Sequence, residues 1–176
     1  MKRRFGYKHI LLGLTLSIAV TGCANTKPNN PTNETQGGGT PVETPAAKQL
    51  KVKTFYTDDN LDKLFEREVN ITYTADSDKY KAALDALKTS PDAKLFPLSK
   101  GITYRSAKLD SGNLTIDLSI ASDGRLGAPG EDLLVESIRN SMFQFTEVKT
   151  IEILVDGKKT ESMMGHVSLP HPIKRN

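Results

Sequence analysis

Residues 114–118 read Leu-Thr-Ile-Asp-Leu, and this alternation of apolar and polar side chains predicts a strand with one buried face. The segment before it, 102–109, is a less regular strand whose alternation slips near Ser106, which indicates a β-bulge. Asp-Ser-Gly-Asn at 110–113 separates the two segments and is typical of a turn. The three segments together predict a hairpin.

Helical periodicity occurs on both sides of this hairpin. The apolar positions that share one helical face are Tyr80, Ala83, Leu84 and Leu87 in the segment 78–88, and Leu134, Ile138, Met142 and Phe145 in a segment opening at Pro129. We expect Asp76 or Ser77 to cap the first helix. Acidic residues in the first turn of the second favour its start, because the helix dipole is positive there.

Further strands are predicted at 50–56, 69–73 and 151–155, and Asp-Gly at 156–157 forms a turn after the last of them. Since the strands alternate and are not apolar throughout, helices should cover only one face of the sheet. We therefore predict an α+β fold for residues 50–176. It is a two-layer sandwich of the split β-α-β type, with two helices on one face of a mixed sheet.

The N-terminal segment 1–22 has the features of a secretory signal: basic residues, a short apolar run at 10–20, and small residues at its end. The run is about half the roughly 20 residues that a transmembrane helix requires. Val-Thr-Gly-Cys at 20–23 resembles the bacterial lipobox, and that resemblance implies cleavage before Cys23 and a diacylglyceryl group on its sulfur. A plain signal peptide or a short uncleaved anchor remains the alternative.

Cys23 is the chain's one cysteine, so lipidation accounts for a thiol that has no disulfide partner. Two acyl chains anchor stably, because each buried methylene contributes about 0.8 kcal/mol. Residues 24–49 are rich in Pro, Gly, Asn and Thr, with Val42 as the one large apolar residue, and predict a flexible tether. A structured N-terminal arm is the alternative. We expect a domain lipid-anchored to the extracytoplasmic face of the cell membrane.

The charge balance changes when the signal is set aside. The chain has 24 basic and 21 acidic residues and a formal charge of +3. Four basic residues and no acidic ones fall in 1–22, so 20 basic and 21 acidic groups remain, a net charge of −1. That balance argues against nucleic-acid binding. A single cysteine excludes a disulfide framework and a cysteine-based zinc site.

Four stretches together resemble the GerMN domain family of sporulation and germination proteins. They are Phe55-Tyr56 with Asp58-Asp59, Tyr80–Lys88 followed by Leu98–Ile102, Asn113–Ser119, and Ile138–Val148 running into Ile151–Gly157 with the closing Gly165–Leu169. The resemblance implies a fold similar to the ring-building motifs of secretion and sporulation assemblies, with self-association possible. It also implies a role in the envelope of a spore-forming Gram-positive bacterium. This chain has room for one such domain.

The histidines that survive processing are His166 and His171, and their spacing without a nearby carboxylate is not a metal signature. We expect His166 to hydrogen-bond a loop carbonyl. Residues 58–62 begin like a calcium loop, but Lys63 and Val69 occupy positions that need glycine and glutamate. A solvated turn is therefore expected there.

Gly124, Gly127 and Gly130 precede a helix, but their spacing is not a phosphate-binding fingerprint. We expect a flexible loop rich in left-handed backbone. No Gly-x-Ser-x-Gly elbow is present, and paired carboxylates cannot be identified from spacing. The sequence thus assigns no catalytic residue, metal or cofactor, and the chain is not expected to be an enzyme.

Two functions from different classes remain. The first is an interaction module whose exposed sheet face or edge docks another envelope protein. The second is a module that binds peptidoglycan or a small envelope ligand, although exposed aromatic side chains are scarce for this purpose. A hydrolase would require a deep cleft lined by acidic residues with displaced pKa values. Asp117 and His166 are the first positions to mutate, and loss of stability is expected before loss of chemistry.

Overall fold

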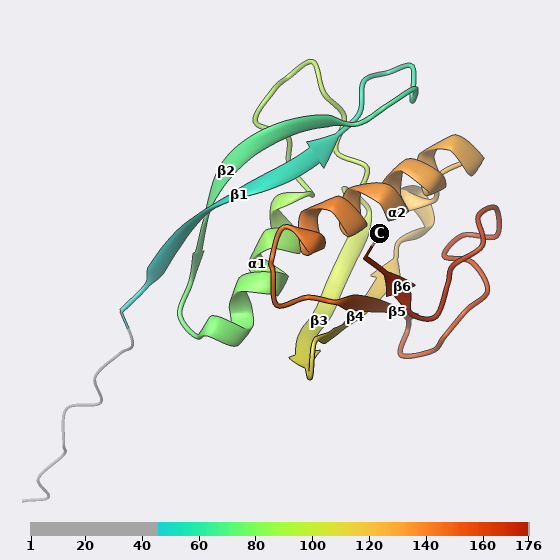
Figure 1. The fold of residues 1–176 in the computed structure, drawn as a ribbon. Helices are drawn as coiled ribbons and strands as arrows, with labels where there is room; N and C mark the ends of the chain where they lie inside the picture. Colours follow the sequence, from blue (N-terminus) through green and yellow to red (C-terminus); the bar gives the residue numbers. More distant parts are fainter. Residues whose placement is uncertain (1–45, 176) are drawn as a thin grey trace, which may run out of the picture. The chain divides into compact units, whose positions relative to one another are not determined.

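The structure is a computed structural model that describes residues 46–175 (Figure 1). The predicted signal peptide, Cys23 and nearly all of the predicted tether lie outside the described residues. Strand β1 begins at Lys48, two residues before the predicted start at Leu50. No helix in the described part of the chain is long and apolar enough to cross a membrane.

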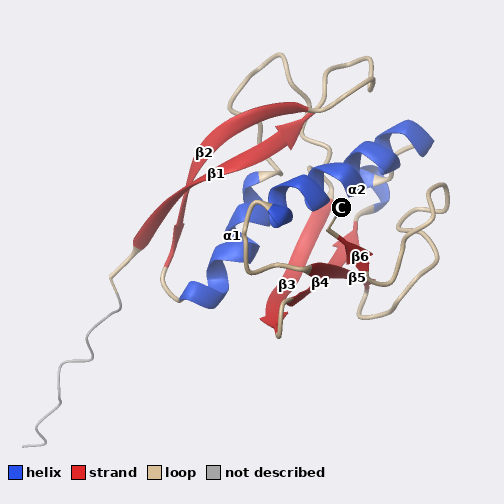
Figure 2. Ribbon diagram, viewed as in Figure 1, coloured by secondary structure: helices blue, strands red, loops and turns tan. Residues whose placement is uncertain are grey.

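The element order matches the predicted alternation of strands and helices (Figure 2). The elements are β1 (Lys48–Tyr56), β2 (Phe65–Tyr73), the 3-10 turn η1 (Asp76–Asp78), α1 (Lys79–Ala86), β3 (Ile102–Asp110), β4 (Asn113–Ile120), the 3-10 turn η2 (Ser122–Gly124), α2 (Ala128–Phe143), β5 (Thr150–Val155) and β6 (Ile173–Lys174). The two-residue strand β6 carries no periodicity and was not predicted.

The main sheet is mixed, with strand order β3-β4-β5-β6. Strands β3 and β4 form the predicted antiparallel hairpin, β4 and β5 are parallel, and β5 pairs with β6 in the antiparallel sense. Strands β1 and β2 form a separate two-stranded ribbon. Helices α1 and α2 lie between this ribbon and the main sheet (Figure 1). The predicted α+β fold, with both helices on one face of a mixed sheet, is confirmed.

The core follows from the sequence periodicity. The alternating residues Leu114, Ile116 and Leu118 of β4 are fully buried, as are Leu134, Ile138 and Met142 of the α2 stripe. Burying such a side chain contributes about 1.5–3 kcal/mol. Phe145, the last predicted member of the stripe, is buried although α2 ends at Phe143.

The predicted bulge in β3 is present. Tyr104 pairs with Leu118 and Ser106 pairs with Asp117, so Arg105 is the extra residue. The bulge restores the phase of the strand, because Tyr104 and Ala107 are both buried although three positions apart.

Two local predictions are wrong. Neither Asp76 nor Ser77 caps α1, because a 3-10 turn occupies 76–78 and makes Asp78 the N-cap residue, without a side-chain hydrogen bond. The loop at 124–130 is not rich in left-handed backbone, since its glycines do not have positive φ. Gly124 instead permits close packing: a Cβ there would lie 2.6 Å from the Cα of Gly101.

Candidate interaction site

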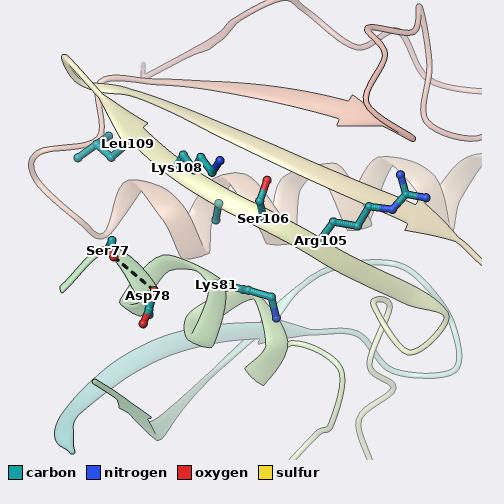
Figure 3. A pocket seen from close by; sticks show the side chains of 8 residues that line it. Ser77, Asp78, Lys81, Arg105, Ser106, Lys108 and Leu109 are labelled. Carbon is teal, nitrogen blue, oxygen red and sulfur yellow. Dashed lines mark hydrogen bonds between the residues drawn. The ribbon is translucent and has the colours of Figure 1, made fainter. Parts of the chain in front are cut away.

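A groove runs beside β3, the first strand of the main sheet. Strand β4 pairs with one edge of β3, and the groove lies between the other edge and the start of α1 (Figure 3). Its volume is about 540 Å³. The residues that line this β3-edge groove are Ser77, Asp78, Lys81, Arg105, Ser106, Ala107, Lys108 and Leu109.

Five consecutive strand residues, 105–109, line the groove together. Successive side chains of a strand point to opposite faces of the sheet, so a hollow that touches all five runs along the strand's edge. Within residues 46–175, β4 is the one strand that pairs with β3. The outward backbone N–H and C=O groups of 105–109 therefore border the groove without a strand partner.

Three of the eight residues that line the groove are basic, and one is acidic. Lys81 forms an ion pair with Asp85 of the same helix, with Nζ 2.7 Å from Oδ2. Arg105 pairs with Asp156 and lies 4.0 Å from Asp117. Lys108 is exposed and has no ion-pair partner among the described residues.

A shallower hollow of about 360 Å³ adjoins the groove. It shares Asp78 and Lys81 with the groove and extends to residues 72–74 at the end of β2. A third hollow, of about 270 Å³, lies elsewhere, and Phe96, Pro97 and Leu126 are among its lining residues. Phe96 is the one large apolar side chain that the described part of the chain leaves exposed, at 39%.

The acidic residues with displaced pKa values lie outside these three hollows. Lys79 donates to Glu147 and is the largest cause that lowers the pKa of Glu147 to about 2. Burial raises the pKa of Glu131, but hydrogen bonds from Ser162 and nearby backbone amides together lower it by more. The pKa of Glu131 is therefore below its ordinary value. Neither residue lines any of these three hollows.

Glu131 has a structural role at the start of α2. Its carboxylate is fully buried and accepts hydrogen bonds from the Ser162 hydroxyl at 2.7 Å and the Met164 amide at 2.9 Å. The amide of His166 donates to its second oxygen at 3.0 Å. These contacts fix the loop that leads from β5 to β6.

The expectation for His166 is wrong, because its side chain is exposed and its contribution is the backbone amide. The histidine that reaches a loop carbonyl is His171, whose Nε2 lies 2.7 Å from the Thr160 oxygen. His171 Nδ1 also contacts Glu152, a carboxylate close in space although 19 residues away in sequence.

Asp117, the other residue singled out for mutation, supports a turn. Its Oδ1 accepts a hydrogen bond of 2.8 Å from the Gly157 amide. Asp156 and Gly157 both have positive φ, at 51° and 75°. Asp117 therefore fixes the strained turn after β5 to the neighbouring strand β4.

The acidic stretch at 58–62 lies between β1 and β2. Asp58 Oδ1 accepts a hydrogen bond of 3.1 Å from the Asn60 amide, which stabilises a local turn. Across residues 46–175, no group of three or more His, Cys, Asp or Glu side chains is arranged to hold a metal ion.

Sequence reasoning did not single out Arg105, Lys108 or Lys81. A usable signal was present in β3, where the slip in alternation coincides with two basic residues. Bulges and charged side chains, lysine especially, are typical of strands at the edge of a sheet. Lys81 could not be found in this way, because only the tertiary fold places it opposite β3.

Comparisons with known proteins agree with this architecture. A family model named Germane and described as sporulation and spore germination matches residues 53–161. The first GerMN domain of the sporulation protein GerM from Bacillus subtilis superposes with a TM-score of 0.55 at 14% identity, covering 72% of this chain and 98% of that chain. A Clostridium perfringens protein assigned as a lipoprotein gives a TM-score of 0.50 at 22% identity, covering 73% and 88%.

The tandem GerMN domains of the same Bacillus subtilis protein give a TM-score of 0.48 at 18% identity, covering 80% of this chain and 50% of that chain. A comparison with curated protein sequences finds no match. The two superpositions with TM-scores of 0.55 and 0.50 establish the fold, and the predicted GerMN-type architecture is confirmed.

Proposed function

The chain belongs to the Germane family of sporulation and spore germination proteins, and from that membership we propose that it is a membrane-anchored envelope lipoprotein. Its domain acts as a non-catalytic protein-interaction module in sporulation or germination complexes. The anchor is the diacylglyceryl group on Cys23. The lipoprotein assignment of the Clostridium perfringens relative supports this part of the proposal.

The β3-edge groove is the observation that carries the interaction role. It combines an unpaired strand edge with three basic residues and one acidic residue in the lining of a hollow of about 540 Å³. A strand edge recognises another protein through main-chain hydrogen bonds, and adjacent side chains add specificity. The displaced carboxylates serve ion pairs and loop contacts, which favours a binding role over a hydrolytic one.

A strain test addresses the role in the bacterium that carries this chain. Deletion should lower the yield of heat-resistant or germinating spores, and Cys23→Ala should reproduce much of that loss because the domain is no longer anchored. Cys23→Ala should also abolish labelling with radioactive palmitate, while an unrelated lipoprotein in the same strain keeps its label. Normal spores from the deletion strain would refute the sporulation role.

Docking of a protein partner is tested separately by photo-cross-linking on intact sporulating cells. A photoreactive residue at Lys108, an exposed position in the β3-edge groove, should capture an envelope protein. One at Glu68, on the β1–β2 ribbon, serves as the matched control. Equal capture from both positions would contradict a specific docking surface.

The alternative, binding of a wall glycan or small envelope ligand, rests on Phe96. This exposed ring borders the hollow of about 270 Å³, together with Lys100 and Asp123. Aromatic faces with a few polar neighbours are common at ligand sites. Co-sedimentation with purified wall sacculi that Phe96→Ala removes, and Lys63→Ala does not, would favour this function.

A further inference from the structure

We propose that the β3-edge groove takes an extended acidic segment of a partner protein, which pairs with β3 as an added strand. This inference rests on the proposed interaction function and specifies the surface and the chemistry of its partner. The occupant is a peptide strand in which acidic side chains alternate with apolar ones. Its backbone pairs with β3, and its side chains contact the basic and apolar residues of the groove.

The backbone of β3 provides the first part of the argument. Strand β4 takes up the hydrogen-bonding groups on one edge of β3 through the pairs from Ile102–Ile120 to Asp110–Asn113. The opposite edge has no strand partner in the described chain, and η1 and α1 leave the groove open beside it. An added strand would lie about 4.8 Å from β3, the ordinary spacing within a sheet.

The length of the added strand is limited at both ends. The bulge at Arg105 interrupts regular pairing, and the hairpin turns after Asp110, where Ser111 has a φ of 49°. The straight part of the edge is therefore 106–110. At about 3.3 Å per residue it offers roughly 16 Å, enough for a short segment.

The charged residues of the groove favour an acidic composition for the partner segment. Lys81, Arg105 and Lys108 line the groove against one acidic residue, Asp78. The first two are engaged with carboxylates of this chain, whereas Lys108 has no ion-pair partner in the part described. An acidic side chain opposite Lys108 would gain an ion pair, and a basic one would be repelled.

The different burial of the two faces of β3 favours an alternation of acidic and apolar side chains in the partner strand. Lys108 is exposed, whereas its neighbour Ala107 is buried and Leu109 is half-buried. A strand lying alongside would direct successive side chains to these two environments in turn. Acidic residues on the Lys108 side and apolar residues on the Ala107 and Leu109 side fit both.

The test uses the purified full-length lipidated chain in detergent micelles. The probe is a fluorescein-labelled seven-residue peptide that alternates Glu and Val, and the comparison peptide alternates Lys and Val. Fluorescence anisotropy should detect the acidic peptide with a dissociation constant below about 1 mM, and binding should weaken at high salt. Hydrogen exchange should slow at those alternate amides of 106–109 that point away from β4.

Variants connect binding to this edge. Lys108→Glu should weaken binding of the acidic peptide by about fivefold or more, because an attraction becomes a repulsion. Lys94→Glu makes the same charge change on an exposed loop away from β3 and should leave binding unchanged. Circular dichroism checks that both variants keep the fold.

Several outcomes would overturn the inference. They are no binding of the acidic peptide, equal binding of both peptides, binding that Lys108→Glu leaves intact, and exchange protection confined to other strands. Self-association that protects β3 in sedimentation and exchange experiments, without peptide binding, would assign the groove to a second copy and also refute it.

The proposed function fails or stands independently of this result. If deletion of the protein impairs sporulation but the acidic peptide does not bind, the envelope role remains and the partner chemistry is wrong. If deletion has no effect while the peptide binds as expected, the groove is confirmed and the sporulation role is refuted.

Discussion

Strands β1 and β3 are each the edge strand of a sheet. Side chains from α2 and its C-cap close the outer edge of β1, whereas the outer edge of β3 is open. At β1, the Gln144 side chain accepts a hydrogen bond from the Lys53 amide at 2.8 Å and donates to the Lys53 carbonyl at 2.9 Å. Ser137 donates to the Phe55 carbonyl at 2.8 Å. The outer edge of β3 receives no equivalent contact within residues 46–175.

The difference shows that an edge can be closed without a further strand. The carboxamide of Gln144 presents one donor and one acceptor, so it satisfies the same two groups as a residue of a neighbouring strand. At β5, closure uses two strand residues, Ile173 and Lys174. At β3, a bulge and basic side chains discourage indiscriminate pairing, and the edge remains accessible to a matching partner.

The largest expected effect concerns the loop that delivers β6 to the edge of β5. Glu131→Ala leaves the Ser162 hydroxyl and the Met164 and His166 amides without their buried acceptor, and should cost about 3 kcal/mol of unfolding free energy. Urea denaturation measures the loss. Asp132→Ala, at an exposed position of the same helical turn, should change stability by less than about 0.5 kcal/mol. Equal effects of the two substitutions would contradict the role of Glu131.

Arg175→Ala tests the closed edge of β5 through the residue that follows β6. The Arg175 guanidinium donates to the carbonyls of Phe143, Phe145 and Val148, and stacks 4.8 Å from the Phe143 ring. We expect a loss of about 2 kcal/mol and faster exchange of the β5 and β6 amides. Lys174→Ala is the neighbouring control, and slow exchange in both variants would show that β6 is held by other contacts.

Gln144→Ala would open the edge of β1. Two hydrogen bonds to Lys53 are lost at a partly exposed site, so the cost should be about 1 kcal/mol. The amide of Lys53 should exchange faster while those of β4 do not. Glu136→Ala, an exposed position on the same helix, serves as control. If Lys53 stays protected, the carboxamide does not close this edge.

The closure of β5 should weaken as the pH rises. The carbonyl of Thr160 and the carboxylate of Glu152 raise the pKa of His171 above its ordinary value. Protonated His171 therefore stabilises the fold fully below a pH of about 6.5, the ordinary pKa of histidine. This stabilisation is lost as the pH rises through the higher pKa of His171 in the folded state. Unfolding free energies measured on both sides of that range should differ, and His171→Gln should remove this difference. An unchanged pH profile in the variant would contradict the assignment.

The smallest effect is expected at the open edge. Lys108→Glu breaks no ion pair in the described chain, so the unfolding free energy should change by less than about 0.5 kcal/mol. A larger loss would mean that Lys108 supports the fold, and the contrast between the closed and open edges would fail. Thermal unfolding followed by circular dichroism, with Lys94→Glu in parallel, provides this measurement.

Much of the fold could be predicted because its signals are local. The alternation at 114–118, the slip near Ser106 and the apolar stripe of α2 each reflect the repeat of one element, and each appears in the structure. Pairing between distant strands has no such signature. Periodicity therefore did not separate the β1–β2 ribbon from the main sheet, and it could not reveal β6, which has two residues.

The closed edge of β1 and the loop after β5 depend on contacts that no sequence pattern contains. Gln144 and Lys53 are 91 residues apart, and the loop contacts made by His166 and His171 depend on how the chain returns after β5. The family resemblance favoured His166, whereas the fold places His171 against Glu152 and Thr160. The basic character of β3 could be read from its residues, but its open edge required the tertiary structure.

The ribbon also has a mechanical consequence. Tension on the chain before residue 46 would enter the domain at Lys48, where its ammonium group lies 2.8 Å from Asp76. A pull along β1 must shear nine residue pairs together, and Gln144 would transmit part of that load to α2. Strand β3 lies on the far side of the helices (Figure 1). A domain pulled by its N-terminal end would therefore carry the load in the ribbon and keep the β3 edge largely unstrained.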